Sequence, residues 1–475
     1  MHKTAVLNVV GLTPGCLGAS MPALTRWAAQ GTSARIKSAF PAVTCSAQSD
    51  YLTGRYPDTH GIVGNGWYSR EDAEIRFWKQ SNMLVRAPKI WETARAADPS
   101  FTCANLFWWF NMYATADYSV TPRPMYPADG RKIPDVYTAP GDLRDELQSA
   151  LGTFPLFEFW GPRAGIRSTE WIAAAAKHVD RTLNPTLTLV YLPHLDYNLQ
   201  RVGPGPAAAG DLRQIDTVVD DLIRHYESAG ARVIVLSEYG IGDVSMPVHL
   251  NRVLRQHGLI AVREELGHEM LDAGASAAFA VADHQVAHIY VNDRARLSEV
   301  RGIVENVAGV DAVLGQTEKA AYHIAHERAG DLVAISRPDA WFTYYFWMDD
   351  RRAPDFARTV EIHRKPGYDP VELFIDPAIR IPPLTVGWKL AKRKAGFRSP
   401  LDVIPLDASL VKGSHGRLTT WDEEGPVLIT KQKGLLESDR ITSVDVHDVI
   451  LRHLDSGGAG LSAGGASLSA GGAGL

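Results

Sequence analysis

Residues 41–65 read PAVTCSAQSDYLTGRYPDTHGIVGN, and this stretch decides how the rest of the chain is interpreted. Thr44 stands just before a short helical run, and Asn65 follows a loop of the pattern Thr-Gly-x-x-Pro-x-x-His-Gly. A hydroxyl at a helix N-terminus lies near free backbone N–H groups and the positive end of the helix dipole, which together favour an anion. The simpler alternative is a threonine that caps a helix before an ordinary turn. The length and order of the whole pattern favour a site at which Thr44 attacks an anion.

The pattern resembles the nucleophile region of the nucleotide pyrophosphatase/phosphodiesterase branch of the alkaline phosphatase superfamily. Seven residues fall in the register of that family, in order: Thr44, Thr53, Gly54, Pro57, His60, Gly61 and Asn65. The resemblance implies that Thr44 attacks phosphorus and that Asn65 holds a phosphate oxygen. It also implies an alkaline-phosphatase-like α/β fold over most of residues 1–455.

The composition is that of an ordinary globular protein. The chain has 475 residues, of which 45% are hydrophobic and 22% charged, and this length supports one large core or two domains. The net charge of −5 gives no electrostatic case for nucleic-acid binding. The three cysteines, Cys16, Cys45 and Cys103, have no CxxC spacing, so neither a disulfide framework nor a zinc ribbon is indicated.

The sequence favours a cytoplasmic protein. The first apolar run, residues 4–10, is too short for a signal sequence and ends without a small-residue cleavage pattern. No stretch approaches the roughly 18 apolar residues of a membrane span. We therefore expect neither a transmembrane segment nor a disulfide-forming compartment, although many members of the resembled family are exported.

Apolar runs alternate with amphipathic patterns along the chain, which is typical of a doubly wound α/β sheet with helices on both faces. The strands are expected at 4–10, 34–38, 102–107, 186–192 and 232–237, and the helices at 21–30, 168–182, 211–228 and 247–257. Ligands bind beyond the carboxyl ends of the strands in such sheets. Thr44, Asp196 and Glu238 each lie at or shortly after a strand end, so we expect them to converge.

The pattern of predicted strands and helices changes from about residue 267. A smaller α+β insertion is predicted at about 267–365, with strands at 284–291, 332–336 and 341–347 and a helix at 295–307. Residues 366–412 are proline-rich and predicted to be irregular, and the basic run 389–394 within them is interpreted as a solvated face. Residues 456–475 are Gly/Ala/Ser repeats and are predicted to form a flexible tail.

The resembled family holds two metal ions, and this chain keeps only part of each ligand set. One family site takes an aspartate, a histidine four residues later and a late histidine in a His-Gly motif. Asp196 and His415 match the first and last of these, but Gln200 stands in the second position. The other family site takes an aspartate after the first strand and an Asp-His pair after a later strand.

Val10 stands where the first-strand aspartate is expected, and Glu238 and Tyr239 stand in place of the Asp-His pair. What remains is an oxygen-rich set of candidate metal ligands: Asp196, Gln200, Glu238 and His415. Such a set suits one divalent ion, Zn²⁺, Mg²⁺ or Mn²⁺, or no metal at all. A threonine hydroxyl needs a base or a metal to become a good nucleophile, so these replacements bear directly on activity.

Other polar residues are candidates for the same pocket. Tyr239, His194 and Asn198 are assigned to substrate binding. Taken singly, each candidate residue is more simply explained as a turn cap, a surface carboxylate or a loop histidine. Taken together in family register with Thr44 and Asn65, they favour a shared pocket. His284 and His288 lie on a β-rich run and are interpreted as structural.

Two functions follow from these patterns. The first is a metal-dependent hydrolase of a phosphate ester or diester with Thr44 as nucleophile. The alternative is a pseudoenzyme that binds a phosphorylated or prenylated metabolite at a degenerate metal site, with Tyr239 filling the metal position. The chain also resembles a divergent branch found in small bacterial gene clusters with a prenyltransferase, through residues 8–13 and 237–241. That resemblance implies a phosphorylated small-molecule or lipid-linked substrate.

Overall fold

A nine-stranded sheet forms the centre of the molecule. The computed structural model describes residues 1–128, 131–397, 399–420 and 424–455. The strand order is β21-β2-β20-β9-β1-β8-β5-β6-β7. In that order, the strands span Arg440–Thr442, Thr32–Lys37, Val427–Thr430, Arg232–Leu236, Thr4–Val9, Leu187–Leu192, Cys103–Leu106, Tyr118–Pro122 and Val136–Ala139. The fold class predicted from the sequence, an alkaline-phosphatase-like α/β fold, is confirmed.

The parallel part of this sheet is its middle. Strand β1 pairs in parallel with β8 and β9, and β5 pairs in parallel with β8 and β6. The outer strands differ from the expected parallel pattern, because β20 runs antiparallel to both β9 and β2, and β7 runs antiparallel to β6. Strand β20 comes from the last fifth of the chain. It separates the early strand β2 from the five parallel strands at the centre, β9, β1, β8, β5 and β6. The sequence did not predict β20, because its four residues are too few to show a period.

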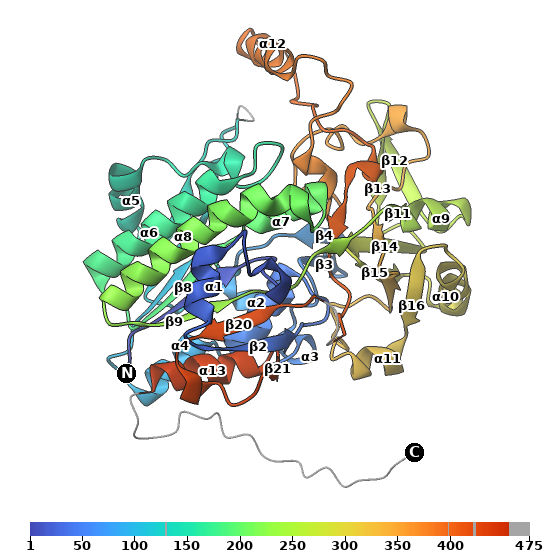
Figure 1. The fold of residues 1–475 in the computed structure, drawn as a ribbon. Coiled ribbons are helices and arrows are strands. Elements are labelled where there is room, and N and C mark those ends of the chain that lie inside the picture. The colour runs from blue at the N-terminus through green and yellow to red at the C-terminus, as the bar shows by residue number, and fades with distance from the viewer. Residues whose placement is uncertain (129–130, 398, 421–423, 456–475) are drawn as a thin grey trace, which may run out of the picture.

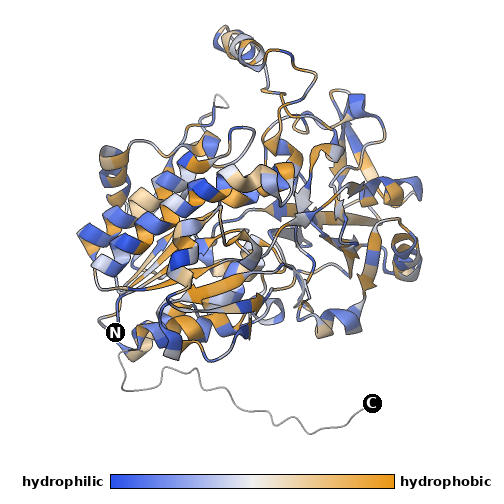
Figure 2. Cartoon of the chain, viewed as in Figure 1, coloured by the Kyte–Doolittle hydropathy of each residue, from blue (hydrophilic) through white to orange (hydrophobic). Residues whose placement is uncertain are grey.

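Helices cover both faces of the sheet (Figure 1). One layer contains α1, α5, α6 and α8, which contact one another and the strands beneath them. The other layer contains α2, α4 and α13. Figure 2 shows orange strands at the centre and mixed colours on the outer helices, as expected for a sheet buried between amphipathic helices. These helices span Pro22–Ala28, Leu143–Leu151, Ile166–Leu183, Ala209–Ser228, Thr44–Thr53, Ile90–Ala97 and Asp445–Leu454.

A second, antiparallel sheet has the order β14-β15-β17-β16, with strands Ala278–Asp283, Val286–Val291, Leu332–Ser336 and Val310–Leu314. Helices α9 (Leu250–Gln256), α10 (Leu297–Glu305) and α11 (Gln316–Ala321) lie around it. The strand expected at 341–347 is shorter than predicted, since only β18 (Ala340–Phe342) is extended and paired, with β11 (Met246–Val248). The four aromatic residues that follow β18 pack instead into a separate buried cluster, so packing rather than strand pairing accounts for their burial.

The proline-rich region is less irregular than the sequence indicates. Helix α12 (Pro382–Lys394) lies within it and stands away from the body at the top of Figure 1. Two prolines open this helix, at positions where their missing N–H groups cost nothing. The predicted tail, 456–475, lies outside the described residues. Among the helices that the structure describes, none is long and apolar enough to cross a membrane.

Candidate active site

The loop pattern of residues 53–61 positions the segments around Thr44. Helix α2 begins at Thr44 and ends at Gly54, which adopts a left-handed conformation with φ 61°. Pro57 opens the short helix α3 (Pro57–His60), and Gly61 ends it with φ 78°. Both glycines meet a backbone requirement that other residues satisfy poorly. His60 is fully buried and its Nε2 lies 2.8 Å from Asp50 Oδ1, so this histidine holds α2 and α3 together.

Thr44, Tyr239 and Asp196 form a continuous hydrogen-bonded chain. Tyr239 Oη donates to Asp196 Oδ1 across 3.1 Å and lies 3.0 Å from Thr44 Oγ1. Since the tyrosine proton is directed at the carboxylate, its oxygen is free to accept the proton of Thr44. All three groups are buried, and Thr44 is 4% exposed. A hydroxyl, a phenol and a carboxylate are therefore linked in series, and this series is called here the relay.

The relay is held in place by a second ring of contacts. Gln200 Nε2 donates to Asp196 Oδ2 across 3.0 Å, and Tyr368 Oη donates to Gln200 Oε1 across 2.8 Å. The Tyr239 ring stacks on His415 with centroids 3.6 Å apart and planes within 7°. His415 in turn is fixed by a 2.7 Å contact from Nδ1 to the carbonyl oxygen of Ala42, which lies two residues before Thr44. The orientation of Tyr239 is therefore determined by packing as well as by hydrogen bonding.

Glu238 lies beside Thr44, whose hydroxyl lowers the pKa of this carboxyl group, and it has two further partners. Its Oε1 accepts hydrogen bonds from Asn8 Nδ2 and Gln48 Nε2, each at 2.6 Å. Its Oε2 and the Oδ1 of Asn8 are both buried acceptors without a hydrogen-bond donor. A proton on Glu238 turns one of these acceptors into a donor, which relieves part of that deficit. Asn8 and Gln48 thus surround a carboxyl group that is best accommodated in its neutral form.

Burial sets the charge of the site. It raises the pKa of Glu238 to about 8 and that of Asp196 to about 7, because a carboxylate loses its hydration inside the protein. Burial also lowers the pKa of His415 to about 3, so this imidazole is neutral at physiological pH. Asp196 titrates near neutral pH, where a carboxyl group is able both to accept and to release a proton.

Asn65 lies beside the start of α2. Its Oδ1 accepts the backbone N–H of Cys45 at 3.1 Å, and its Nδ2 donates to Asp283 Oδ1 at 3.0 Å. Asp283 Oδ2 also accepts the backbone N–H of Asn65 at 2.8 Å, and burial raises the pKa of Asp283 to about 7. Asn65 is therefore next to the start of α2, and Asp283 in the smaller sheet holds it there.

We tested whether the residues present fit the divalent metal that the family resemblance implies. Asp196 Oδ1 and His415 Nε2 lie 3.7 Å apart, and that imidazole nitrogen has no hydrogen-bond partner. However, Asp196 already accepts two hydrogen bonds, and Glu238 is bonded elsewhere. Among the described residues, no group of three His, Cys, Asp or Glu side chains is placed to hold a metal ion, whereas Zn²⁺ takes about four ligands. The four expected ligands therefore do not form the family's metal site.

The residues gathered around Thr44 are called here the Thr44 cluster: Thr44, Asn65, Asp196, Gln200, Glu238, Tyr239 and His415. Two other predicted site residues, His194 and Asn198, face away from this cluster. Both residues lie on helix α7 (His194–Val202), one turn apart. His194 Nε2 lies 3.2 Å from Asp211 Oδ1, and Asn198 bonds to Asp211 and Arg201. Asp196 and Gln200 occupy the opposite face of the same helix, because two residues correspond to about 200° of rotation.

Several residues that the sequence analysis passed over belong to the site. Gln48 lies one turn after Thr44 on α2, and that helical spacing is a signal that was available in the sequence. His284, which was interpreted as structural, stacks on Tyr368 and packs at a tilt against His415, with centroids 3.7 Å apart in each pair. No local pattern marks Asp283 or Tyr368, because both come from the smaller sheet and the loops that follow it.

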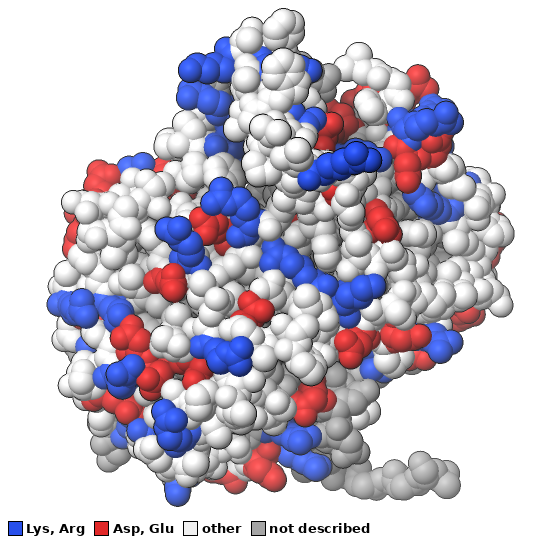
Figure 3. Space-filling model, turned by 45° about the horizontal axis from the view of Figure 1, so that its top comes forward, with Lys and Arg blue, Asp and Glu red and all other residues white. Residues whose placement is uncertain are grey.

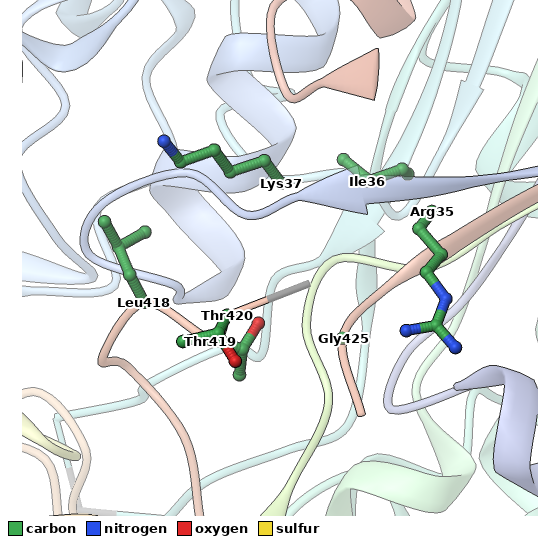
Figure 4. Close-up of a pocket in the computed structure, with 7 residues that line it drawn as sticks. All are labelled: Arg35, Ile36, Lys37, Leu418, Thr419, Thr420 and Gly425. Atoms are coloured by element: carbon green, nitrogen blue, oxygen red, sulfur yellow. The ribbon is translucent and has the colours of Figure 1, made fainter. Parts of the chain in front are cut away.

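Two cavities lie near this region. The larger, of about 920 Å³, borders the cluster at His415 and is also lined by Gly11, Leu199, Ile241, Gln285 and Ser414. The smaller, of about 330 Å³, lies between strand β2 and the residues Leu418, Thr419, Thr420 and Gly425 (Figure 4). Thr44 lines neither cavity, so the larger one approaches Thr44 through His415 and its stacked partner Tyr239.

A comparison with known families decides the relationship. Residues 4–369 match the family described as type I phosphodiesterase/nucleotide pyrophosphatase. The chain belongs to this family. The resemblance predicted from residues 41–65 is therefore confirmed over more than three quarters of the chain. No curated protein matches the chain.

Solved structures share the fold at low sequence identity. Phosphonoacetate hydrolase from Sinorhizobium meliloti 1021, in complex with phosphonoformate, is 16% identical, with a TM-score of 0.60, over 95% of this chain and 96% of its own. Murine ectonucleotide pyrophosphatase/phosphodiesterase 5, in an inactive threonine-to-alanine form with AMP, is 13% identical, with a TM-score of 0.57, over 96% and 95%. The human counterpart is also 13% identical, with the same TM-score, over 95% and 94%. At these identities the likeness supports the fold.

Proposed function

We propose that this phosphodiesterase-family chain hydrolyses a phosphate ester or diester with Thr44 as the nucleophile. The observation that carries the proposal is the hydrogen-bonded chain from Thr44 through Tyr239 to Asp196. The inactive threonine-to-alanine form of the murine neighbour, which binds AMP, is consistent with a nucleophilic threonine in this fold. The substrate class follows from the family: a phosphorylated small molecule whose organic part is accommodated by the larger cavity beside His415.

In the proposed reaction, Thr44 Oγ1 attacks phosphorus and the bond from phosphorus to the leaving oxygen breaks. The Thr44 proton passes to Tyr239 while the Tyr239 proton passes to Asp196, which is able to accept it as a carboxylate. The leaving alcohol departs with the bonding electron pair and takes a proton from water. The hydroxide left from that water then attacks phosphorus, the bond from phosphorus to Thr44 Oγ1 breaks, and Thr44 regains its proton from Asp196 through Tyr239. Asn65 is proposed to orient the phosphate together with the N–H groups at the start of α2.

The test compares Thr44→Ala with Thr44→Ser on 4-nitrophenyl phosphate and bis(4-nitrophenyl) phosphate, each with and without a chelator. Thr44→Ala is expected to lower turnover by a factor of at least about 10³, because the bond-forming atom is gone. Thr44→Ser keeps that atom and is expected to retain measurable turnover. Full turnover in Thr44→Ala would remove Thr44 as nucleophile.

The position of Tyr239 also favours a second function, a binding protein for a phosphorylated or prenylated metabolite. The Tyr239 ring stacks on His415, and its hydroxyl joins Thr44 to Asp196, so it fills the place where the family resemblance implies a metal. On this alternative, no turnover is detected and Thr44→Ala weakens binding of a short prenyl diphosphate only by a factor of about 2 to 10, the value of one hydrogen bond. Calorimetric titration of both forms distinguishes the two functions.

A further inference from the structure

The region around helix α12 has a charge unlike that of the rest of the chain. Residues 377–401, called here the basic segment, contain no Asp or Glu and six cationic residues, in a chain whose net charge is −5. These are Arg380, Lys389, Lys392, Arg393, Lys394 and Arg398. The projecting part at the top of Figure 3 shows blue and white atoms, in keeping with this composition.

The basic segment also exposes large apolar side chains. Ile381, Leu384, Trp388 and Phe397 are 55%, 67%, 63% and 67% exposed, and Leu390 and Leu401 are exposed as well. These six are a large share of the fourteen exposed large hydrophobic side chains among the described residues. None of them belongs to the hydrophobic clusters of the described structure. A cluster of exposed apolar side chains on a surface marks a site that contacts another molecule or a membrane.

The segment is attached to the body at one narrow point. The backbone N–H of Asp376 donates to the carbonyl oxygen of Val403 at 2.8 Å, so the chain leaves and returns at the same place. Lys389 pairs with Asp402 near this point, which fixes the base of the helix. Figure 1 shows α12 clear of both sheets. The helix is therefore free to meet a surface with most of its circumference.

Aromatic, aliphatic and cationic side chains are interleaved on α12. Leu384 and Trp388 lie one turn apart and share a face with Ile381. Lys392 lies a further turn along, with Nζ 5.2 Å from the centre of the Trp388 ring. Lysines beside Trp and Leu on a short helix are typical of helices that lie in the interface of a bilayer. The 13 residues of α12 extend about 20 Å, too short to span the roughly 30 Å of a bilayer core.

We infer that the basic segment docks on an anionic membrane surface, with α12 lying in the headgroup region. Charge complementarity selects this occupant, since each cationic side chain near such a surface raises binding roughly fivefold. A second copy of the chain is disfavoured because it would bring two acid-free cationic segments together. The exposed apolar surface also continues beyond α12 to Phe397 and Leu401, which a protein groove that binds one helical stripe would leave uncovered. This inference does not depend on the proposed hydrolysis.

Vesicle sedimentation with the full chain tests the inference. The probes are phosphatidylcholine vesicles with and without about one third phosphatidylserine, at about 0.1 M and 0.5 M salt, where screening differs strongly. Binding is expected only with phosphatidylserine, and weaker at high salt. Leu384→Ser with Trp388→Ser, and separately Lys392→Glu with Lys394→Glu, are each expected to weaken binding about tenfold or more.

Matched controls replace similar residues elsewhere. Met83→Ser with Leu266→Ser removes apolar side chains that are 80% and 85% exposed, and Arg181→Glu with Arg213→Glu reverses two exposed helical charges. Both control variants are expected to bind as the wild type does. Absence of wild-type binding to anionic vesicles overturns the inference, as does equal binding by all variants. The inference is also overturned if the wild type does not bind vesicles but forms a dimer that the segment variants dissociate. In that case the basic segment binds a second copy of the chain.

Discussion

The Thr44 cluster and the basic segment reverse the usual distribution of polarity in opposite ways. The cluster buries two carboxyl groups and an imidazole, and the basic segment exposes tryptophan, leucine and phenylalanine. Inside the protein, each of these groups has at least one partner within the same chain, and burial shifts their pKa values toward neutral forms, which suits the atoms left without a partner. The exposed apolar groups have no such partners among the described residues. The buried polar groups are thus explained by contacts within the molecule, whereas the exposed apolar side chains indicate contact with another surface.

The largest expected effect comes from returning the cluster to the ligand set of its family. Val10→Asp, Gln200→His, Glu238→Asp and Tyr239→His in one variant should raise zinc affinity on the order of 10³-fold or more, because charged donors replace the relay. Each single change should raise zinc affinity only slightly, because the ligands of one metal site act as a unit. Equilibrium dialysis with metal analysis measures the effect. A combined variant that folds but takes up no zinc would show that the surrounding packing, rather than the ligand set, excludes the metal.

The next effect concerns the relay itself. Tyr239→Phe keeps the ring that stacks on His415 and removes the hydroxyl between Thr44 and Asp196. Turnover is expected to fall by about 10 to 100-fold, the usual contribution of a positioned proton-transfer group. The hydrogen bond from Tyr239 lowers the pKa of Asp196, so its loss should move the acidic limb of the pH–rate profile to higher pH. Tyr197→Phe is the control, since that hydroxyl bonds to neither group. A Tyr239→Phe enzyme with unchanged rate and profile would exclude the relay.

A smaller effect is expected in the stability of the fold. The pKa of Glu238 is raised to about 8, so its stabilising contribution is complete below the unfolded value of 4.5 and is lost as the pH rises through 8. The lowered pKa values of His284 and His415 act in the opposite direction only below about 6.5. Between pH 6.5 and 8, Glu238 should therefore lower the free energy of unfolding by up to about 2 kcal/mol, and Asp196 and Asp283, with pKa values raised to about 7, should add smaller decreases near pH 7.

Glu238→Gln should flatten this slope, because the amide oxygen still accepts from Asn8 and Gln48 and carries no proton to lose. Urea unfolding at pH 6.5, 7.5 and 8.5 measures the slope, with the exposed Glu71→Gln as the control. Equal slopes in wild type and Glu238→Gln would contradict the assignment of a neutral Glu238.

The smallest effect sharpens the contrast between the two regions. Leu384→Ser with Trp388→Ser should change turnover of a soluble substrate less than about twofold and the free energy of unfolding by no more than about 0.5 kcal/mol, as expected for surface positions. Trp347→Ser, in a fully buried aromatic cluster, should cost about 3–5 kcal/mol. A large loss of stability in the segment variant would mean that α12 packs on the body in solution.

The sequence by itself determined the family, the central strands and the local structure around Thr44. Residues 41–65 carry these predictions because their helix start, glycine turns and buried His60 are local features, each readable within a few residues. The strands at 4–9, 187–192 and 232–236 were predictable because runs that are buried on both faces are continuously apolar. The basic composition of 389–394 was also visible, but its interpretation as a solvated face depended on knowing what lay around it.

Only the tertiary structure decided which contacts are made by the residues at the expected metal-ligand positions. Tyr239 meets Thr44 across 195 positions, and Asn8 meets Glu238 across 230, and nothing in the local sequence marks either pair. The same holds for α12, because its apolar residues differ from core residues only in where the chain places them. Residue types fix which contacts are chemically allowed. The contacts that form depend on long-range packing, which brings distant segments together and sets the burial that shifts each charge.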